Sequence, residues 1–335
     1  MNVNDYAYPS ARIRAMKGNL LDKTKIEELL RAHNLDEFVE LLADTIYCRV
    51  FEGMGGINLR NIDRVLLDDL FDTHNKVFFM APKNSQPLFF SMLMHYEIQC
   101  VKEIISSTIS RKEVDTDKFP SRDPEFLRNL SKSDNLDEMF DLLKQSRYKK
   151  AFTEIQSVSD GTQILLALDK YFYDKLWRVL KSINNEIAKR ILGPEFDFVN
   201  IMTLLRINKI GDSENRPKID NYLVPTYKVR NIEKLISSGS IDEIVSNLSN
   251  TAYREALEEG LKAYMETKQL LKFEISLRKL LLQFSRKYLM GYPFQIGLLL
   301  GYLKLKESEI RNLRAIATGI NHRLSSDDIK ELIVI

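Results

Sequence analysis

One pattern that occurs three times constrains the fold of this chain more than any other feature. In each copy a polar residue precedes an aspartate and a glutamate, an apolar helical stripe follows, and a tyrosine stands eleven positions after the aspartate. The markers are Asn34, Asp36, Glu37 and Tyr47; Asn135, Asp137, Glu138 and Tyr148; and Ser240, Asp242, Glu243 and Tyr253. Because these features recur together and in the same order, the sequence predicts three copies of one structural unit.

The start of each copy predicts a capped amphipathic helix. The polar residue can accept a hydrogen bond from an N–H group of the first turn, and the glutamate three positions later can reach back, as in a capping box. Acidic side chains in the first turn also favour the positive end of the helix dipole. The apolar stripe along this helix comprises Phe38, Leu42 and Phe51 in the first copy, Met139, Leu143 and Phe152 in the second, and Ile244, Leu248 and Leu257 in the third.

The length of the repeat indicates three small helical bundles. Apolar residues recur at spacings of three and four, and the chain holds only 13 glycines and 9 prolines, which together predict an all-α fold. The three aspartates lie 101 and 105 residues apart, far beyond the ~34 to 47 residues of solenoid repeats. Polar stretches at 106–125 and 208–221 mark the linkers. We therefore predict three similar helical-bundle lobes with pseudo-threefold symmetry, at residues 1–110, 111–215 and 216–335.

Composition excludes several classes of protein. The 49 Lys and Arg against 47 Asp and Glu leave no uniformly basic surface for nucleic acid. Cys48 and Cys100 belong to no paired motif, so reduced cytosolic thiols are expected. The N-terminus has no apolar signal region, and the most apolar stretch, 288–303, contains Gly, Pro and Gln and falls short of the ~20 residues of a membrane-spanning helix. We expect a protein that can sit on a membrane without crossing it.

An acidic run offers the one enzymatic alternative. Asp68, Asp69 and Asp72 form a DD-x-x-D pattern that could hold Mg²⁺ against a diphosphate, as in all-α prenyl diphosphate enzymes. The repeat argues against this, because Lys170 and Tyr173 replace Asp69 and Asp72 in the second copy. A solvated helix face is the favoured interpretation, and a magnesium-dependent prenyl diphosphate enzyme stays as an alternative.

Other catalytic and metal-binding motifs are also weak. The run 53–56 is rich in glycine but lacks the Lys-Ser/Thr pair of a phosphate loop. The four histidines are scattered through the sequence, and no serine or cysteine lies in a nucleophile elbow. We predict no catalytic residue, no metal site and no cofactor.

Several segments together carry a family resemblance. They are 6–17, 41–47, 197–201, 222–225 and 306–314. In these segments and in its triplication, the chain resembles the C subunit of archaeal-type ATP synthases, which is similar to the d subunit of eukaryotic V-type ATPases. One departure is Cys100, which follows Glu97 by three positions where the other two copies have asparagine. This departure argues against a repeated functional site made of the acid and the asparagine.

The resemblance implies a funnel or bowl of helices without catalytic activity. Such a protein is a central-stalk rotor component attached to the proteolipid ring on the cytoplasmic face of the cell membrane. Its cavity would receive the coiled-coil D component of the rotating shaft, which the F component accompanies, during ATP synthesis or hydrogen ion and other ion transport. The implied partners are thus the D/F shaft and the ring, with no nucleic acid and with membrane contact only through the ring. A generic helical scaffold protein is the other non-enzymatic alternative.

Two polar groups are the candidate partner contacts. They are Arg12, Arg14 and Lys17 near the N-terminus, and Arg311, Asn312 and Arg314 in the last long helix. The first group matches the family's N-terminal pattern and could meet an acidic partner, although a solvated helix face explains it better. The second group could line a polar cavity, and packing salt bridges explain it equally well.

Overall fold

The chain folds into helices throughout its described part. The computed structural model describes residues 3–111, 123–153, 161–210 and 222–334, together with 114, 116, 119 and 121. Every regular element in these residues is a helix, which confirms the predicted all-α class. Among the described helices, none combines the length and the apolar composition needed to cross a bilayer. The chain divides into two compact units, Met1–Gln86 with Glu255–Ile335 (unit 1) and Pro87–Arg254 (unit 2).

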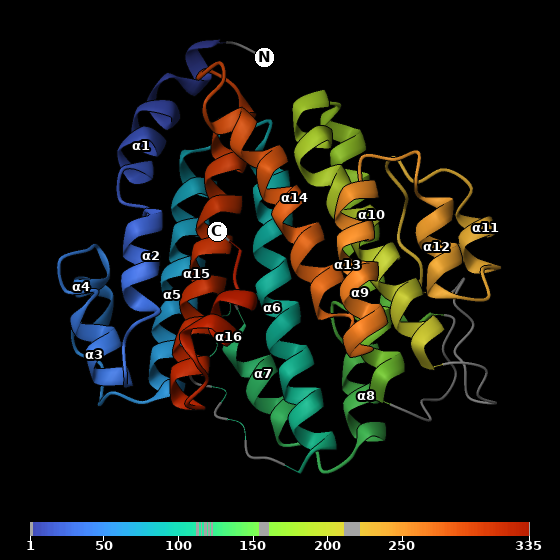
Figure 1. Cartoon of the computed structure of the whole chain (residues 1–335), viewed down its shortest axis with the longest axis horizontal. Helices are drawn as coiled ribbons and strands as arrows, with labels where there is room; N and C mark the ends of the chain where they lie inside the picture. Colours follow the sequence, from blue (N-terminus) through green and yellow to red (C-terminus); the bar gives the residue numbers. More distant parts are fainter. Residues whose placement is uncertain are drawn as a thin grey trace. The chain divides into compact units, whose positions relative to one another are not determined.

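Unit 1 joins the first and last parts of the sequence. Its helices are η1 (Val3–Tyr6), α1 (Ala7–Lys17), α2 (Lys23–Leu29), α3 (Leu35–Glu40), α4 (Tyr47–Phe51), α5 (Leu59–Met80), α14 (Leu271–Leu289), α15 (Ile296–Asn321) and α16 (Ser326–Glu331), with α13 (Arg254–Thr267) beginning at the boundary. Helix α15 packs against α14, α5 and α1 (Figure 1). Its side chains Leu299, Leu303 and Ile316 are fully buried, so α15 is the centre of this unit's core.

Unit 2 is built around the long helices of the middle of the sequence. Its helices are α6 (Gln86–Ile109), α7 (Pro124–Ser131), α8 (Leu136–Gln145), η3 (Lys149–Phe152), α9 (Gly161–Ile183), α10 (Glu186–Ile210), α11 (Ile232–Ile236) and α12 (Ile241–Asn247). Helix α9 packs against α10 and η3, and α10 packs against α12, which lies beside α11 (Figure 1). Two of the long helices in this unit, α9 and α10, therefore pack against short helices.

The predicted caps are present at all three repeat starts. In the first copy the Asn34 side chain accepts a hydrogen bond from the Glu37 N–H at 2.9 Å, and the Glu37 carboxylate accepts from the His33 N–H at 2.8 Å. The other two copies repeat both bonds with Asn135, Glu138 and Asp134, and with Ser240, Glu243 and Gly239. The cap bond is therefore as predicted, but each glutamate accepts from the N–H group of the residue before the cap and not from that of the cap residue itself, as a capping box requires.

The predicted continuous helix behind each cap is wrong in its length. Helix α3 ends at Glu40, before Leu42, and a separate helix begins at Tyr47. The Thr45 hydroxyl donates to the Leu42 carbonyl at 2.7 Å and accepts from the Tyr47 N–H at 3.1 Å. These local bonds compete with the helical ladder, which is how a threonine or serine ends a helix.

The predicted thirds are not the two units that form. Unit 1 contains α1 to α5 of the first copy and α13 to α16 of the third, while unit 2 contains α6, the second copy and the start of the third. The division at residues 110 and 215 stays a prediction, and position 215 lies outside the described residues.

Candidate functional site

Each of the three repeated tyrosines is buried in the same local setting. In every copy a hydroxyl side chain two positions earlier accepts the tyrosine N–H and donates to a leucine carbonyl, as Thr45 does for Tyr47. The equivalent pairs are Ser146 with Tyr148 and Thr251 with Tyr253. The turn fixes the backbone, so the phenol ring is directed inward; none of the three tyrosines is more than 1% exposed.

Each tyrosine hydroxyl donates to a buried carboxylate on a long helix. Tyr47 bonds to Glu309 of α15 at 2.6 Å, within unit 1. Within unit 2, Tyr148 bonds to Glu97 of α6, and Tyr253 bonds to Asp197 of α10 at 2.7 Å. Glu97, Asp197 and Glu309 stand three positions before Cys100, Asn200 and Asn312 in the three copies. The partner that this acid has in every copy is therefore the tyrosine and not the asparagine.

The pairs follow a cyclic order through the three copies. The tyrosine of the second copy bonds to the acid of the first, and the tyrosine of the third bonds to the acid of the second. The tyrosine of the first copy bonds to the acid of the third. Every short-helix segment is therefore held by the long helix of the copy before it, and the first segment is held by the last long helix.

Each buried carboxylate is satisfied by different additional donors. Asp197 accepts from the backbone N–H groups of Tyr227, Lys228 and Val229, at 2.8, 2.8 and 3.2 Å. Burial raises the pKa of Asp197, and these N–H groups act in the opposite direction. Glu97 lies 3.2 Å from the Arg147 guanidinium. A buried carboxylate is tolerated only with such partners. The equivalent acid is therefore satisfied by backbone N–H groups in the second copy and by an arginine in the first.

In unit 1 the tyrosine–acid pair is extended by a buried lysine, Lys306, which lies in the segment 306–314 of the family resemblance and was not among the predicted site residues. The Lys306 side chain is 1% exposed, and its ammonium donates to the Tyr47 hydroxyl at 2.7 Å. The same ammonium lies 2.9 Å from Asp69 of α5 and 3.2 Å from Glu309. Burial, followed by the charge of Glu309, raises the pKa of Tyr47 well above its ordinary value, so the phenol keeps its proton. The cluster is a fixed network that joins α4, α5 and α15.

The DD-x-x-D run is divided among separate surroundings. Asp69 faces Lys306, whereas Asp68 lies 3.6 Å from Arg64 on its own helix and Asp72 is exposed. No group of three His, Cys, Asp or Glu side chains within the described ranges is placed to hold a metal ion. Asp69 therefore forms an ion pair with Lys306 of another helix, and this ion pair joins α5 to α15.

A second pair of ionisable side chains lies on the same two long helices. His74 of α5 is buried, and its Nε2 lies 3.1 Å from Glu307 of α15, which also accepts from Lys304 at 2.8 Å. Burial lowers the pKa of His74. Burial alone would raise the pKa of Glu307, but the Lys304 charge and the His74 hydrogen bond outweigh it and hold that pKa below its usual range. The imidazole is therefore a neutral donor to a charged carboxylate.

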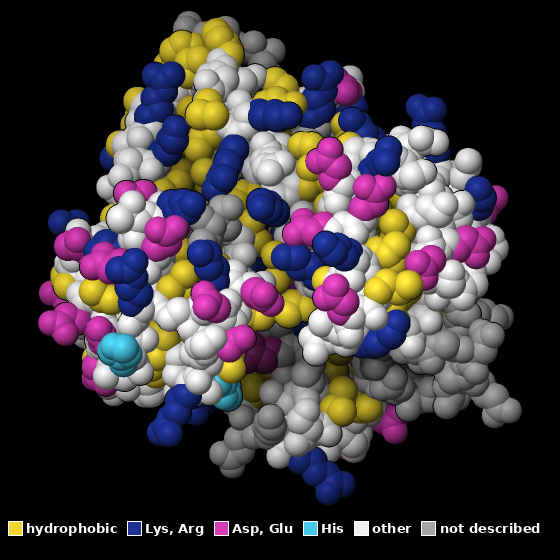
Figure 2. All heavy atoms as spheres, viewed as in Figure 1, with side chains coloured by type: hydrophobic (Ala, Val, Ile, Leu, Met, Phe, Trp, Pro, Cys, Tyr) yellow, Lys and Arg dark blue, Asp and Glu magenta, His cyan; other side chains and the backbone are white. Residues whose placement is uncertain are grey.

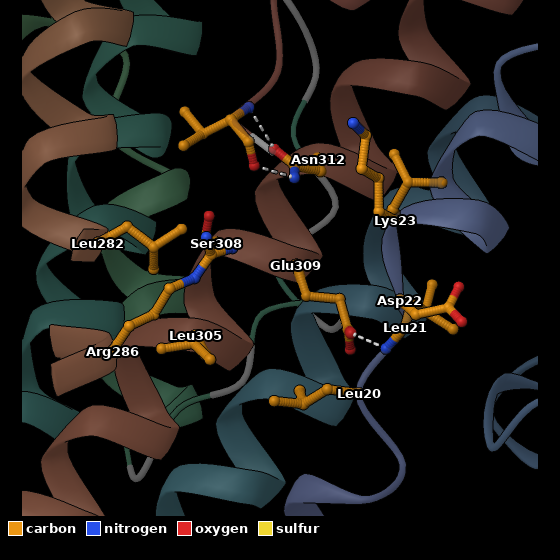
Figure 3. Close-up of a pocket in the computed structure, with 12 residues that line it drawn as sticks. Leu20, Leu21, Asp22, Lys23, Leu282, Arg286, Leu305, Ser308, Glu309 and Asn312 are labelled. Atoms are coloured by element: carbon orange, nitrogen blue, oxygen red, sulfur yellow. Dashed lines mark hydrogen bonds between the residues drawn. The ribbon is translucent and has the colours of Figure 1, made fainter. Parts of the chain in front are cut away.

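A small pocket lies beside Glu309 in unit 1. It has a volume of about 120 Å³ and is lined from α15 by Glu309 and Asn312, as Figure 3 shows. Glu309 accepts from the Leu21 N–H at 2.5 Å, and the Asn312 amide forms two hydrogen bonds with the Val334 backbone, at 2.7 and 3.0 Å. The pocket is smaller than the ~300 Å³ at which small-molecule sites begin. Glu309 and Asn312 hold the backbone at Leu21 and Val334 in place.

The asparagine clamp is repeated in the second copy. The Asn200 amide donates to the Val224 carbonyl at 2.8 Å and accepts from the Val224 N–H at 2.9 Å. Cys100 occupies this position in the first copy and has no amide with which to form such a clamp. The departure noted in the sequence thus removes a backbone clamp, while the tyrosine–acid pair is retained in all three copies.

The candidate partner contacts are dispersed in the structure. Arg12, Arg14 and Lys17 are exposed on α1. On α15, Arg314 forms a two-point ion pair with Asp63 of α5, Asn312 is buried, and Arg311 is exposed. The packing interpretation therefore holds for Arg314, and the other contacts stay predictions.

Comparisons with known proteins agree on one family. A family model described as ATP synthase (C/AC39) subunit matches residues 9–332. The C subunit of the A-type ATP synthase of Methanocaldococcus jannaschii is 28% identical over 98% of this chain and 86% of that protein. The corresponding proteins of Pyrococcus abyssi and Methanothermobacter thermautotrophicus are also 28% identical, over 98% and 93% of this chain and 90% and 83% of their own lengths. With the match extending over nearly all of the sequence, the chain belongs to the ATP synthase (C/AC39) subunit family.

Proposed function

We propose that this chain is the non-catalytic central-stalk component of an A-type or V-type rotary ATPase. It joins the membrane proteolipid ring to the D/F shaft and lies on the cytoplasmic face of the cell membrane as a peripheral protein. The family match over residues 9–332 supports the assignment to such an ATPase. In this role the chain transmits torque during ATP synthesis or ion pumping.

The repeated tyrosine–acid pairs support the mechanical part of this proposal. A rotor adapter must not deform under torque, so its segments need buried, directional joints. Hydrogen bonds to charged groups are about twice as strong as neutral ones. Three such bonds hold short-helix segments onto the long helices, with all three tyrosines fully buried. Close-packed interiors around these bonds are poorly compressible and pass strain onward.

The cyclic order of the pairs also favours three similar lobes arranged around a pseudo-threefold axis. Each long helix binds the tyrosine of the following copy, and the long helix of the last copy binds the tyrosine of the first. No copy is therefore left without a neighbour on either side. A closed arrangement of this kind would form the funnel, and its opening would hold the shaft. This arrangement is the architectural part of the proposal.

A binding experiment with the shaft tests the proposal. The purified chain is mixed with the purified D/F complex of the same ATPase and separated by size-exclusion chromatography. We expect a stable one-to-one complex, and Arg311→Glu should weaken it if this exposed α15 side chain meets the shaft. The matched control is Lys262→Glu, which reverses an exposed charge on α13 in the same unit. Failure to associate with either D/F or the proteolipid ring would refute the rotor role.

A further inference from the structure

One end of unit 1 exposes several large apolar side chains. This end contains the residues after α5, the loop 290–295 between α14 and α15, and the start of α1. The exposed side chains there are Tyr8, Phe79, Met290, Tyr292 and Phe294. Met290 is 78% exposed, Phe79 is 74% exposed and Tyr8 is 65% exposed, so each of the three segments presents an open apolar side chain.

The N-terminal segment ties the two loops of this end together. The Ser10 hydroxyl donates to the Pro293 carbonyl at 2.6 Å, and the Tyr6 hydroxyl is hydrogen-bonded to the Ser85 side chain. Helix α1 packs on both α5 and α15, and Figure 1 shows its N-terminal end beside the loop that follows α14. The exposed side chains therefore belong to segments that are held together at one end of the unit, and we call them the apolar tip, defined as Tyr8, Phe79, Met290, Tyr292 and Phe294.

Aromatic rings dominate the apolar tip. Tyr292 and Phe294 pack edge to face with their ring centroids 5.8 Å apart. Phe79 packs in the same way on Phe78 of α5 at 5.1 Å. Aromatic side chains with a polar group on one end are enriched at membrane–water interfaces, where an apolar ring and a polar tip are both satisfied.

The surroundings of the apolar tip are strongly basic. The segments 5–18, 76–86 and 283–295 contain seven Lys and Arg and a single acid, Asp5, while the whole chain has a net charge of only +2. The basic residues are all exposed: Arg12, Arg14, Lys17, Lys76, Lys83, Arg286 and Lys287. Figure 2 shows basic and hydrophobic side chains together at this end of unit 1. The segments that make up this end therefore carry an excess of positive charge, with Lys83 and Lys287 within four positions of Phe79 and Met290.

We propose that the apolar tip and its basic surroundings bind the surface of an anionic lipid bilayer. Rings and Met290 enter the headgroup region, while the lysines and arginines contact lipid phosphates. A site for an apolar protein partner would not need the local excess of positive charge, whereas an anionic membrane uses both features. The inference stands apart from the rotor role, because lipid binding by this surface requires neither the shaft nor the ring.

Vesicle sedimentation with the full chain tests this proposal. We expect the chain to pellet with vesicles containing phosphatidylglycerol, to remain in solution with pure phosphatidylcholine vesicles, and to be released by salt. The double variant Met290→Ser/Tyr292→Ser should weaken binding by at least about tenfold, since two exposed side chains lose apolar area that the membrane would bury. Lys83→Gln and Lys287→Gln should each weaken it about fivefold.

Matched control variants carry the same changes at another end of the unit. Met265→Ser/Leu271→Ser removes two exposed apolar side chains near the start of α14, opposite to the loop that follows its last residue. Lys262→Gln removes an exposed charge on α13. These controls should bind vesicles as the unchanged chain does, with unchanged circular dichroism for all variants. Absence of binding to anionic vesicles, equal losses in the controls, or association only with a membrane protein in detergent would overturn the proposal.

Discussion

A buried tyrosine hydroxyl costs free energy unless it meets an acceptor, and each repeated tyrosine has one. Phenylalanine would fill the same space, so the hydroxyl in each copy is explained by its bond to the acid of a long helix. In the sequence, tyrosine and acid both recur, but nothing in their spacing shows that they meet. Lys306 and Asp69 illustrate the same limit, since a buried ion pair between α15 and α5 has no local sequence signal.

At this scale, Tyr148→Phe should lower the free energy of unfolding by about 1 to 3 kcal/mol, because the buried Glu97 carboxylate loses one donor and keeps Arg147. Urea unfolding followed by circular dichroism measures the change. Tyr8→Phe is the control, since Tyr8 is exposed and its substitution should stay within about 0.5 kcal/mol. Equal stability of the Tyr148→Phe variant and the unchanged chain would show that the bond contributes nothing.

At the scale of elements, the helix starts could be predicted and the helix ends could not. The caps at Asn34, Asn135 and Ser240 are local, so sequence spacing alone identifies them. The early end of α3 depends on Thr45, whose hydroxyl donates to the Leu42 carbonyl and accepts from the Tyr47 N–H. These bonds compete with the helical hydrogen bonds, although the apolar pattern of the sequence continues through this segment. Side-chain pairs between long helices, such as His74 with Glu307, depend on which faces pack together.

The His74–Glu307 pair between α5 and α15 predicts how stability depends on pH. The folded pKa of His74 is lowered, so its contribution is present above the ordinary pKa of about 6.5 and is lost as the pH falls below it, by at most about 1.4 kcal/mol per pH unit. The folded pKa of Glu307 is also lowered, so its contribution is lost only below about pH 4.3.

Thermal melts between pH 7.5 and 5 separate the two groups. His74→Gln keeps a donor for Glu307 but cannot titrate, so its melting temperature should fall less than that of the unchanged chain in this window. An identical fall in both proteins would contradict the assignment of a neutral buried His74.

At the scale of the whole molecule, the family settles what kind of protein this is. As a member of a family of structural stalk proteins, the chain is not an enzyme. Its two compact units cut across the three copies of the sequence repeat, because each copy's tyrosine is held by the long helix of another copy. The predicted boundaries at residues 110 and 215 each lie between a tyrosine and the acid to which it bonds.

Two fragments of the chain test this exchange. Residues 87–254 contain both members of the Tyr148–Glu97 and Tyr253–Asp197 pairs, so this fragment should fold into a helical unit with a cooperative melt. Residues 111–215 contain Tyr148 and Asp197 without either partner, so they should melt without cooperativity or aggregate. Circular dichroism melts of both compare them, and a stable, cooperative 111–215 fragment would show that the copies fold independently.

The sequence by itself determined the helical class, the capped starts of the three short helices and the family. These depend on periodicity, on capping chemistry within a few residues, and on motifs in a fixed order, all of which are local. Only the tertiary structure decided that Glu309 meets Tyr47, that Lys306 is buried between α4 and α5, and that Ser10 of α1 bonds to Pro293. Such contacts join residues far apart in the chain. They depend on which helix faces pack together, and the burial of the whole core decides that packing.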